Sequence, residues 1–274
     1  MSSSPKQLFT ELSGQGPHEV RRGETALVGL PGLVFTPRSG SALPAVAFGH
    51  GLLQPPVRYT RLLRHLASWG IVAAAPATQL GPLPSHQLFA ADLRTTLDIC
   101  TGVQLGDGEI SVDQQRLGLA GHSMGAAGAV LAAAKDTRVR AVCTLALTAS
   151  RPPALDAARS ITAPGLHIAA EQDRIAPVAG HAEPVAMAWQ GPVQLRIARK
   201  ASHLGFTEGR HWSELMLDGK PEYTTHRTAR TLLTAFLLVH LNGEERYRPL
   251  LEGEFKAAPL EYSHEEFVTS AAAR

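Results

Sequence analysis

The middle of the chain carries three side chains that together would cleave an ester or a related acyl bond. Ser123 stands in the pentapeptide GHSMG, and Asp173 and His203 each follow a later apolar run. A serine hydroxyl becomes a nucleophile when a base removes its proton, and an acid must orient that base. We therefore predict Ser123 as the nucleophile, His203 as the base and Asp173 as the acid.

The GHSMG pentapeptide lies where an apolar run passes into an alanine-rich segment, which is typical of a strand that turns sharply into a helix. A serine at such a turn has a strained backbone, and the flanking glycines carry no side chains that would collide with neighbouring elements. The first amides of the helix, beginning with Met124, would stabilise negative charge beside the hydroxyl. The alternative interpretation is an incidental serine in a glycine-rich turn.

Other residues compete for two of these roles. Glu171 is the rival acid, but we favour Asp173 because its place further out on the loop lets its carboxylate reach the imidazole. Of the 12 histidines, His203 alone falls in a short loop between the last apolar strand and a terminal helix. Four other histidines are interpreted as structural or surface residues: His50, His65, His122 and His181.

A second donor for a developing oxyanion is expected in the segment FGHGLL, which follows an early apolar run. Glycine lets the backbone turn there and aim an amide inward. We predict the backbone N–H groups of Leu52 and Met124 as the two oxyanion donors. The same glycines would also suit a simple tight turn.

The elements that must position these residues alternate along the chain. A short β pair is expected at residues 19–27 and 32–36, followed by short apolar runs and helix-like segments in turn. This alternation predicts an α/β fold with a mostly parallel central sheet and helices on both faces. The strands are expected at residues 45–48, 71–75, 116–120, 139–147, 166–170 and 193–197, and the helices at 59–69, 87–101, 124–134, 178–189 and 224–241.

Size and composition favour one domain. The 274 residues are 44% hydrophobic, which is enough for a substantial core. We expect residues 1–16 to be a flexible N-terminal segment and residues 17–274 to be a single domain, with 242–274 as an extension packed on it. Cys100 and Cys143 fall in apolar segments and are expected to be reduced core thiols.

Partners and cofactors are constrained mainly by what the sequence lacks. The formal charge of +2 is scattered, so nucleic acid and anionic membranes are not expected partners. We find neither a membrane-spanning apolar run nor an N-terminal secretory signal, and expect a cytoplasmic protein. Without ligand-like clusters of His, Cys or carboxylates, we expect no metal and no cofactor. The oligomeric state stays open.

The sequence resembles α/β-hydrolases of the dienelactone-hydrolase superfamily, and more narrowly their cutinase-like polyester hydrolase and chlorophyllase-type branch. The resemblance covers about residues 33–241 and rests on the stretches HGLL, GHSMG, EQDRIAPV and ASHLGF. It implies the same nucleophile, acid and base in the order Ser123, Asp173 and His203, and the same two oxyanion amides. It also implies hydrolysis of an ester through an acyl-enzyme.

Three departures from this family limit what the resemblance implies. Polyester hydrolases of the branch carry an aromatic residue where this chain has Leu52, and a tryptophan in the region that reads LTAS here (residues 147–150). Both walls of an aromatic clamp are therefore missing, which weakens the case for aromatic polyesters. Dienelactone hydrolases proper use cysteine, and this chain has Ser123.

The expected site is open, because residues 149–164 are too few for a helical lid. We predict a small ester with a short to medium acyl chain as the partner, in a shallow apolar groove lined by Leu52, Leu53, Met124, Ile175 and Leu204. A thioesterase, amidase or perhydrolase would use the same triad. A binding protein that kept the fold without turnover is the alternative outside enzymology.

Overall fold

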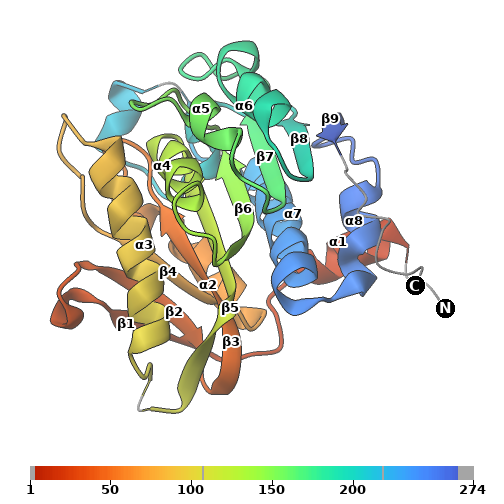
Figure 1. Ribbon diagram of the computed structural model, residues 1–274. Helices are drawn as coiled ribbons and strands as arrows, with labels where there is room; N and C mark the ends of the chain where they lie inside the picture. Colours follow the sequence, from red (N-terminus) through yellow and green to blue (C-terminus); the bar gives the residue numbers. More distant parts are fainter. Residues whose placement is uncertain (1–3, 107, 218, 265–274) are drawn as a thin grey trace, which may run out of the picture.

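One sheet organises the structure, a computed structural model that describes residues 4–106, 108–217 and 219–264 (Figure 1). Over these residues nine strands follow the order β1-β2-β4-β3-β5-β6-β7-β8-β9. The block from β4 to β8 is parallel, and β1, β2 and β9 pair antiparallel at the edges. The strands are β1 (Val20–Glu24), β2 (Gly32–Pro37), β3 (Gly40–Gly49), β4 (Val72–Pro76), β5 (Ile110–His122), β6 (Val139–Leu145), β7 (Gly165–Ala170), β8 (Val193–Ala198) and β9 (Leu260–His264).

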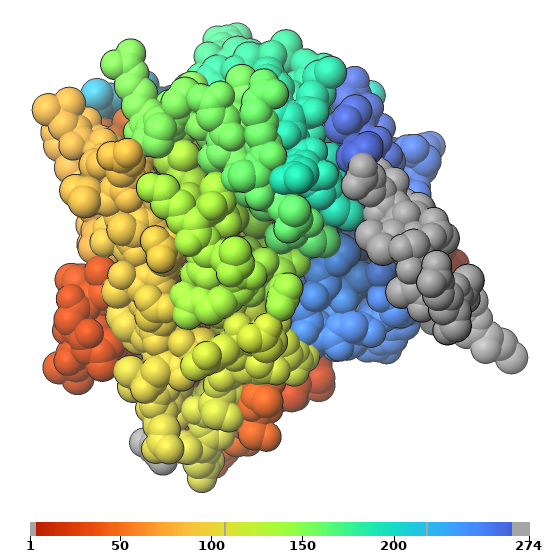
Figure 2. Space-filling view, in the orientation of Figure 1, coloured from red at the N-terminus to blue at the C-terminus, as the bar shows by residue number. Residues whose placement is uncertain are grey.

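Helices cover both faces of this sheet, which confirms the α/β fold expected from the alternation and the α/β-hydrolase fold that the resemblance implied. One face carries α3 (His86–Gly102), α4 (Met124–Ala133), α5 (Ala154–Ala158) and α6 (Ala182–Ala188). The other carries α1 (Pro5–Ser13), α2 (Thr60–Ser68), α7 (Tyr223–Asn242) and α8 (Arg248–Glu252). Figure 2 shows the first face, where the yellow and green segments from α3 to α6 close over the strands. No helix within the described ranges is long and apolar enough to cross a membrane.

The central strands are buried on both sides, which explains their uninterrupted apolar sequences. In β3, Val46 and Phe48 belong to the hydrophobic cluster under α2 and α7. Ala45 and Ala47 point the other way, into the cluster under α3 and α4. Successive side chains of a strand alternate between faces, so a strand covered on both sides needs apolar residues at every position.

The N-terminal segment is more ordered than we expected. We predicted a flexible stretch over residues 1–16, but the structure places α1 there with Leu8 and Leu12 buried. Ser4 begins the helix as an N-cap and exchanges hydrogen bonds with Gln7. The two leucines are four residues apart and so share one helix face, which packs against α7 and α8. Residues 1–3 lie outside the described part.

The C-terminal extension is built into the fold up to His264. Its strand β9 pairs with β8, and residues of α8 join the core beneath α7. Arg196 of β8 is fully buried and donates to the carbonyls of Leu251, Gly253 and Ala258. A buried arginine whose partners are backbone carbonyls ties this segment to the sheet. The remainder of the extension, residues 265–274, lies outside the described residues.

Helix α4 lies unusually close to the strands beneath it. A Cβ atom added to Gly125 would lie 2.1 Å from the carbonyl carbon of Gly49, and one added to Gly121 would lie 2.3 Å from the Gly125 oxygen. Backbone atoms at such distances have no room to give way. Gly128, one turn further along the same helix, has its nearest neighbour at 3.4 Å from the added atom, and that neighbour is a side chain.

Substitution Gly125→Ala is expected to lower the free energy of unfolding by about 3 kcal/mol, the upper end of the usual cost of overpacking. Gly128→Ala is the matched control in the same helix. It should leave stability unchanged or raise it by up to about 1 kcal/mol, because alanine is the better helix former. Urea denaturation of both variants measures the difference. Equal stabilities would show that the contact between α4 and β3 is not rigid.

Several histidines lie in the interior away from the Ser123 region. Burial lowers the pKa of His65 and of His167 to about 3, and that of His240 to about 4, because the charged imidazolium loses its hydration. Arg230 adds to the effect at His65, and Arg248 at His240. These rings are therefore neutral in the folded protein at pH 7.

The protein is expected to lose stability as the pH falls from about 6.5, the pKa of histidine in an unfolded chain, towards 4. In that window the histidines of the unfolded chain bind protons, whereas the buried rings of the folded protein do not. Each such ring therefore lowers the free energy of unfolding by about 1.4 kcal/mol for every unit that the pH falls. Urea denaturation at several pH values measures the slope. Replacing one ring, as in His167→Leu, should make the slope shallower, and an unchanged slope would contradict this account.

Candidate active site

Ser123, His203 and Asp173 come together at the carboxyl ends of three strands of the parallel block. The Ser123 Oγ lies 2.8 Å from His203 Nε2, and His203 Nδ1 lies 2.7 Å from an Asp173 carboxylate oxygen. With Nδ1–H donating to the carboxylate, Nε2 is left to accept the serine proton. The three residues follow β5, β8 and β7, whose carboxyl ends meet at one edge of the sheet.

Ser123 occupies the strained turn expected of it. Its φ of 56° lies in the left-handed region, with ψ at −121°. The turn is fixed on both sides, since the Ser123 amide donates to the Leu145 carbonyl at 2.9 Å and the Ser123 carbonyl accepts from the amides of Ala126 and Ala127. A non-glycine residue persists in this conformation only where its surroundings determine it.

Asp173 is held as a carboxylate by several donors. One of its oxygens accepts from the amides of Ile175 and Ala176 at 2.9 and 2.8 Å, and the other faces His203. Burial opposes ionisation, but the hydrogen bonds outweigh it and the pKa of Asp173 lies below its usual value. Glu171, the rival acid, instead pairs with Arg199 and accepts from the Lys200 amide. The rival therefore faces away from the imidazole.

Leu52 and Met124, whose backbone amides we predicted as oxyanion donors, both line the cavity beside Ser123. Within the described residues, neither amide donates a hydrogen bond to a protein acceptor. The loop that carries Leu52 is itself well anchored. His50 contacts the Thr78 carbonyl at 2.8 Å, and the Gly51 amide donates to the Tyr59 hydroxyl at 3.1 Å. Two free amides on rigid backbone are the arrangement that an oxyanion requires.

A cavity of about 390 Å³ opens in front of Ser123. Of the residues that we expected to line it, Leu52, Met124, Ile175 and Leu204 do so. Leu53 does not, and its backbone takes the left-handed conformation at φ 57°. The described lining contains no Phe, Tyr or Trp. Residues that we did not predict complete the walls: Gln54, Pro82, Leu83, Pro84, His86, Thr148, Ala149 and Leu217.

The unpredicted wall at residues 82–84 had one signal in the sequence. Leu83 is an apolar residue between two prolines in a loop, and its side chain is 95% exposed. Prolines on both sides indicate a loop, so Leu83 is not expected in the core. For Leu217, which belongs to the long connection between β8 and α7, the sequence offered no comparable signal.

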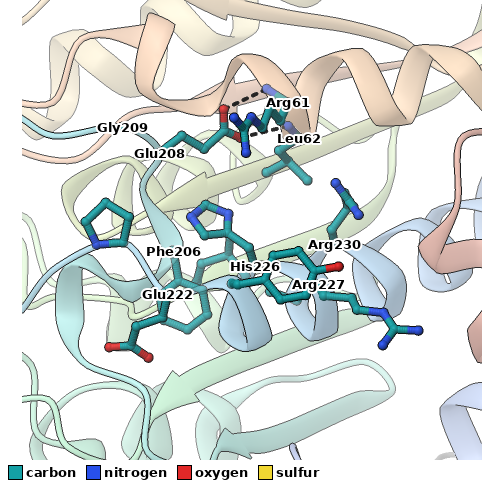
Figure 3. A pocket seen from close by; sticks show the side chains of 13 residues that line it. Arg61, Leu62, Phe206, Glu208, Gly209, Glu222, His226, Arg227 and Arg230 are labelled. Atoms are coloured by element: carbon teal, nitrogen blue, oxygen red, sulfur yellow. Dashed lines mark hydrogen bonds between the residues drawn. The ribbon is translucent and has the colours of Figure 1, made fainter.

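Two acidic side chains, Glu208 and Glu222, bind the chain on either side of His203, and Figure 3 shows where they lie, with the bonds of Glu208 drawn. Glu222 accepts from the Ser202 hydroxyl at 2.6 Å, directly before His203. Glu208, a few residues after it, accepts from the backbone amides of Arg61 and Leu62 at 2.8 and 3.0 Å. These groups line a second cavity of about 180 Å³ that does not reach Ser123. The loop that carries His203 is thus fixed at both ends.

Arg58 anchors the outer part of the same connection. Its side chain is buried and donates to the Thr207 hydroxyl at 2.8 Å and to the Gly209 carbonyl at 2.9 Å. Further along, the Ser213 hydroxyl accepts from the Gln54 amide group at 2.8 Å. Because Gln54 belongs to the loop that carries Leu52, the two walls of the cavity are joined.

Nothing in the described part of the chain forms a metal site, since no group of three or more His, Cys, Asp or Glu side chains is suitably placed there. Both cysteines are free and buried. Burial raises the pKa of Cys100 to about 12 and that of Cys143 well above its ordinary value. Neither thiol is available as a nucleophile at neutral pH.

Comparison of the sequence with known proteins assigns the chain to a family. A family model described as PET hydrolase-like matches residues 13–213. Cutinase est1 of Thermobifida alba is 29% identical over 174 residues, or 62% of this chain and 57% of that protein. A bis(hydroxyethyl) terephthalate hydrolase of Streptomyces coelicolor is 32% identical over 170 residues, or 53% of this chain and 52% of that protein. The chain thus spans little more than half the length of these curated relatives. Because the family match covers well over half of the chain, the protein belongs to the PET hydrolase-like family, as the resemblance to cutinase-like polyester hydrolases indicated.

Proposed function

We propose that the protein is a serine hydrolase of carboxylic esters with short to medium acyl chains. The observation that carries the proposal is the unbroken series of hydrogen bonds from Asp173 through His203 to Ser123 at the wall of an apolar cavity. The named relatives are cutinases and a hydrolase of a terephthalate ester, which supports ester hydrolysis as the reaction.

In the proposed first step the Ser123 oxygen attacks the ester carbonyl carbon while His203 Nε2 takes the serine proton. The carbonyl oxygen becomes an oxyanion, which the amides of Leu52 and Met124 stabilise with two hydrogen bonds. When the tetrahedral intermediate collapses, the imidazolium of His203 gives its proton to the leaving alkoxide. Asp173 stabilises that imidazolium and keeps Nδ1 protonated.

The second step returns the enzyme to its starting state. Water gives a proton to His203 Nε2 and attacks the acyl carbon of the Ser123 ester. The second oxyanion accepts hydrogen bonds from the same two amides. When this tetrahedral intermediate collapses, His203 returns the proton to the serine oxygen and the acid product leaves. No group beyond these side chains and amides takes part.

The cavity supports small aliphatic esters better than long ones. Its volume of about 390 Å³ lies near the lower end of ligand pockets, which range over roughly 300–1,000 Å³. Leucine, proline, methionine and isoleucine side chains dominate the lining, so an acyl chain meets apolar surface. An aromatic ester would find no Phe, Tyr or Trp ring to stack against on the described walls.

The wild-type protein is expected to hydrolyse p-nitrophenyl acetate, butyrate and hexanoate, with kcat/KM falling towards the laurate. Substitution Ser123→Ala should reduce kcat by at least about 10⁴-fold, because it removes the nucleophile. Circular dichroism checks that the variant is folded. Labelling by a fluorophosphonate separates the remaining cases: a labelled but inactive wild type would mean that the substrate class is wrong, and an unlabelled one that Ser123 is no nucleophile.

Asp173→Asn is expected to lower kcat by about 10³- to 10⁴-fold, because the amide cannot hold the imidazole in the required tautomer. Glu171→Gln is the matched control, two residues away on the same loop. Its carboxylate serves a partly exposed ion pair with Arg199, so kcat should stay within about twofold. Steady-state kinetics of both variants decides between the two acids. A larger loss from Glu171→Gln would reverse the assignment.

A further inference from the structure

Three buried hydrogen bonds in series run behind Ser123, and none of them belongs to the triad. The Gly51 amide lies 3.1 Å from the Tyr59 hydroxyl, which lies 2.8 Å from His122 Nδ1. The other ring nitrogen of His122, Nε2, lies 2.9 Å from the backbone oxygen of His203. The series therefore begins one residue before Leu52 and ends on the base itself.

The chemistry of its two ends fixes the direction of every bond in the series. The Gly51 N–H can only donate, so the Tyr59 oxygen accepts it and the hydroxyl proton is free for His122. The His203 carbonyl can only accept, so His122 must carry its proton on Nε2 and accept on Nδ1. A neutral imidazole has one donor and one acceptor, and this arrangement uses both.

The surroundings keep His122 neutral and fixed. Burial is the main cause that lowers the pKa of His122 to about 3, and the neighbouring His203 adds to it. Its ring centre lies 5.1 Å from that of His203 and 5.9 Å from that of Phe206. A Cβ atom on Gly51 would come within 2.9 Å of His122 Nδ1, so the ring packs directly against the loop.

We propose that Tyr59 and His122 are positioning residues that set the distance between the oxyanion loop and the loop of the base. The inference rests on the proposed ester hydrolysis. In that reaction the Leu52 amide and His203 Nε2 must act on the same tetrahedral centre. One end of the series holds the residue before Leu52, and the other holds the backbone of His203. Loss of the link lets the two loops shift independently.

Substitution Tyr59→Phe removes the central hydroxyl and keeps the ring, which packs against Phe48 with 4.8 Å between ring centres. We expect kcat to fall by about 10- to 100-fold, as small misplacements of reacting groups do. KM should change by less than about threefold, since Tyr59 itself does not line the cavity. A decrease confined to KM, or a kcat equal to that of the wild type, would overturn the inference.

Tyr247→Phe is the matched control. Tyr247 is also fully buried, and its hydroxyl donates to Glu11 at 2.9 Å, on the far side of the fold from Ser123. Each variant loses one hydroxyl that makes two hydrogen bonds, with Gly51 and His122 at Tyr59 and with Glu11 and Arg246 at Tyr247, so both are expected to lose stability. Only Tyr59→Phe should lose kcat. Equal losses of kcat from both would mean that the effect is general destabilisation, which also overturns the inference.

A second measurement needs neither turnover nor the variant. Nitrogen-15 NMR of the wild-type imidazoles at pH 7 should show His122 neutral, with Nε2 protonated and Nδ1 bare. Protonation on Nδ1 would leave Nε2 without a proton to donate to the His203 carbonyl, which would break the series and overturn the inference even if Tyr59→Phe fails to fold. Absence of esterase activity in the wild type would instead count against the proposed function. An active wild type with unchanged Tyr59→Phe kcat would count against the positioning role alone.

Discussion

The contact between strand β3 and helix α4 is the constraint on which the rest of the site depends. Gly49 and Gly125 meet there backbone to backbone, with no room for a Cβ atom on the helix residue. This approach lets Ser123 turn at φ 56°, so that its hydroxyl stands away from the sheet and the Met124 amide stays beside it. The same contact fixes where β3 ends. The loop that carries Leu52 begins directly after that point. The same contact therefore positions the proposed nucleophile, Ser123, and both proposed oxyanion donors.

The proposed acid and base, Asp173 and His203, are held in place in a different way. They lie in loops, where no strand ladder satisfies the backbone, and each loop is held by specific polar bonds. The Gln172 amide donates to the Ala201 carbonyl at 2.8 Å and joins the two loops directly. Glu222 and Arg58 hold the connection that follows His203. These groups are buried or partly buried, so the loss of one partner leaves the other unsatisfied, at a cost of about 1–3 kcal/mol.

What could be predicted from the sequence follows from how local each feature is. The parallel strands were predictable where apolar residues fill both faces, as over residues 45–48 and 71–75, and the positions of Asp173 and His203 follow from the strands that end before them. Helix α1 was missed because its stability comes from packing against α7, far away in the chain. The wall at Leu217 and the link from Tyr59 to His122 were missed for the same reason. Tyr59 and His122 are 63 residues apart, and no local pattern marks a pair at that separation.

One wall of the cavity lies partly outside the segment that the family model matches. The family match ends at residue 213, whereas Leu217 lies beyond it. Family membership therefore applies to the segments that carry Ser123, Asp173 and His203, and not to every surface that meets a substrate. Leu83 on one wall and Leu215 near the other are more than nine-tenths exposed. Flexible aliphatic side chains at the rim accept varied acyl groups but supply no flat surface for a ring. We therefore expect the loops at the rim, rather than the fold, to set the selectivity of this protein.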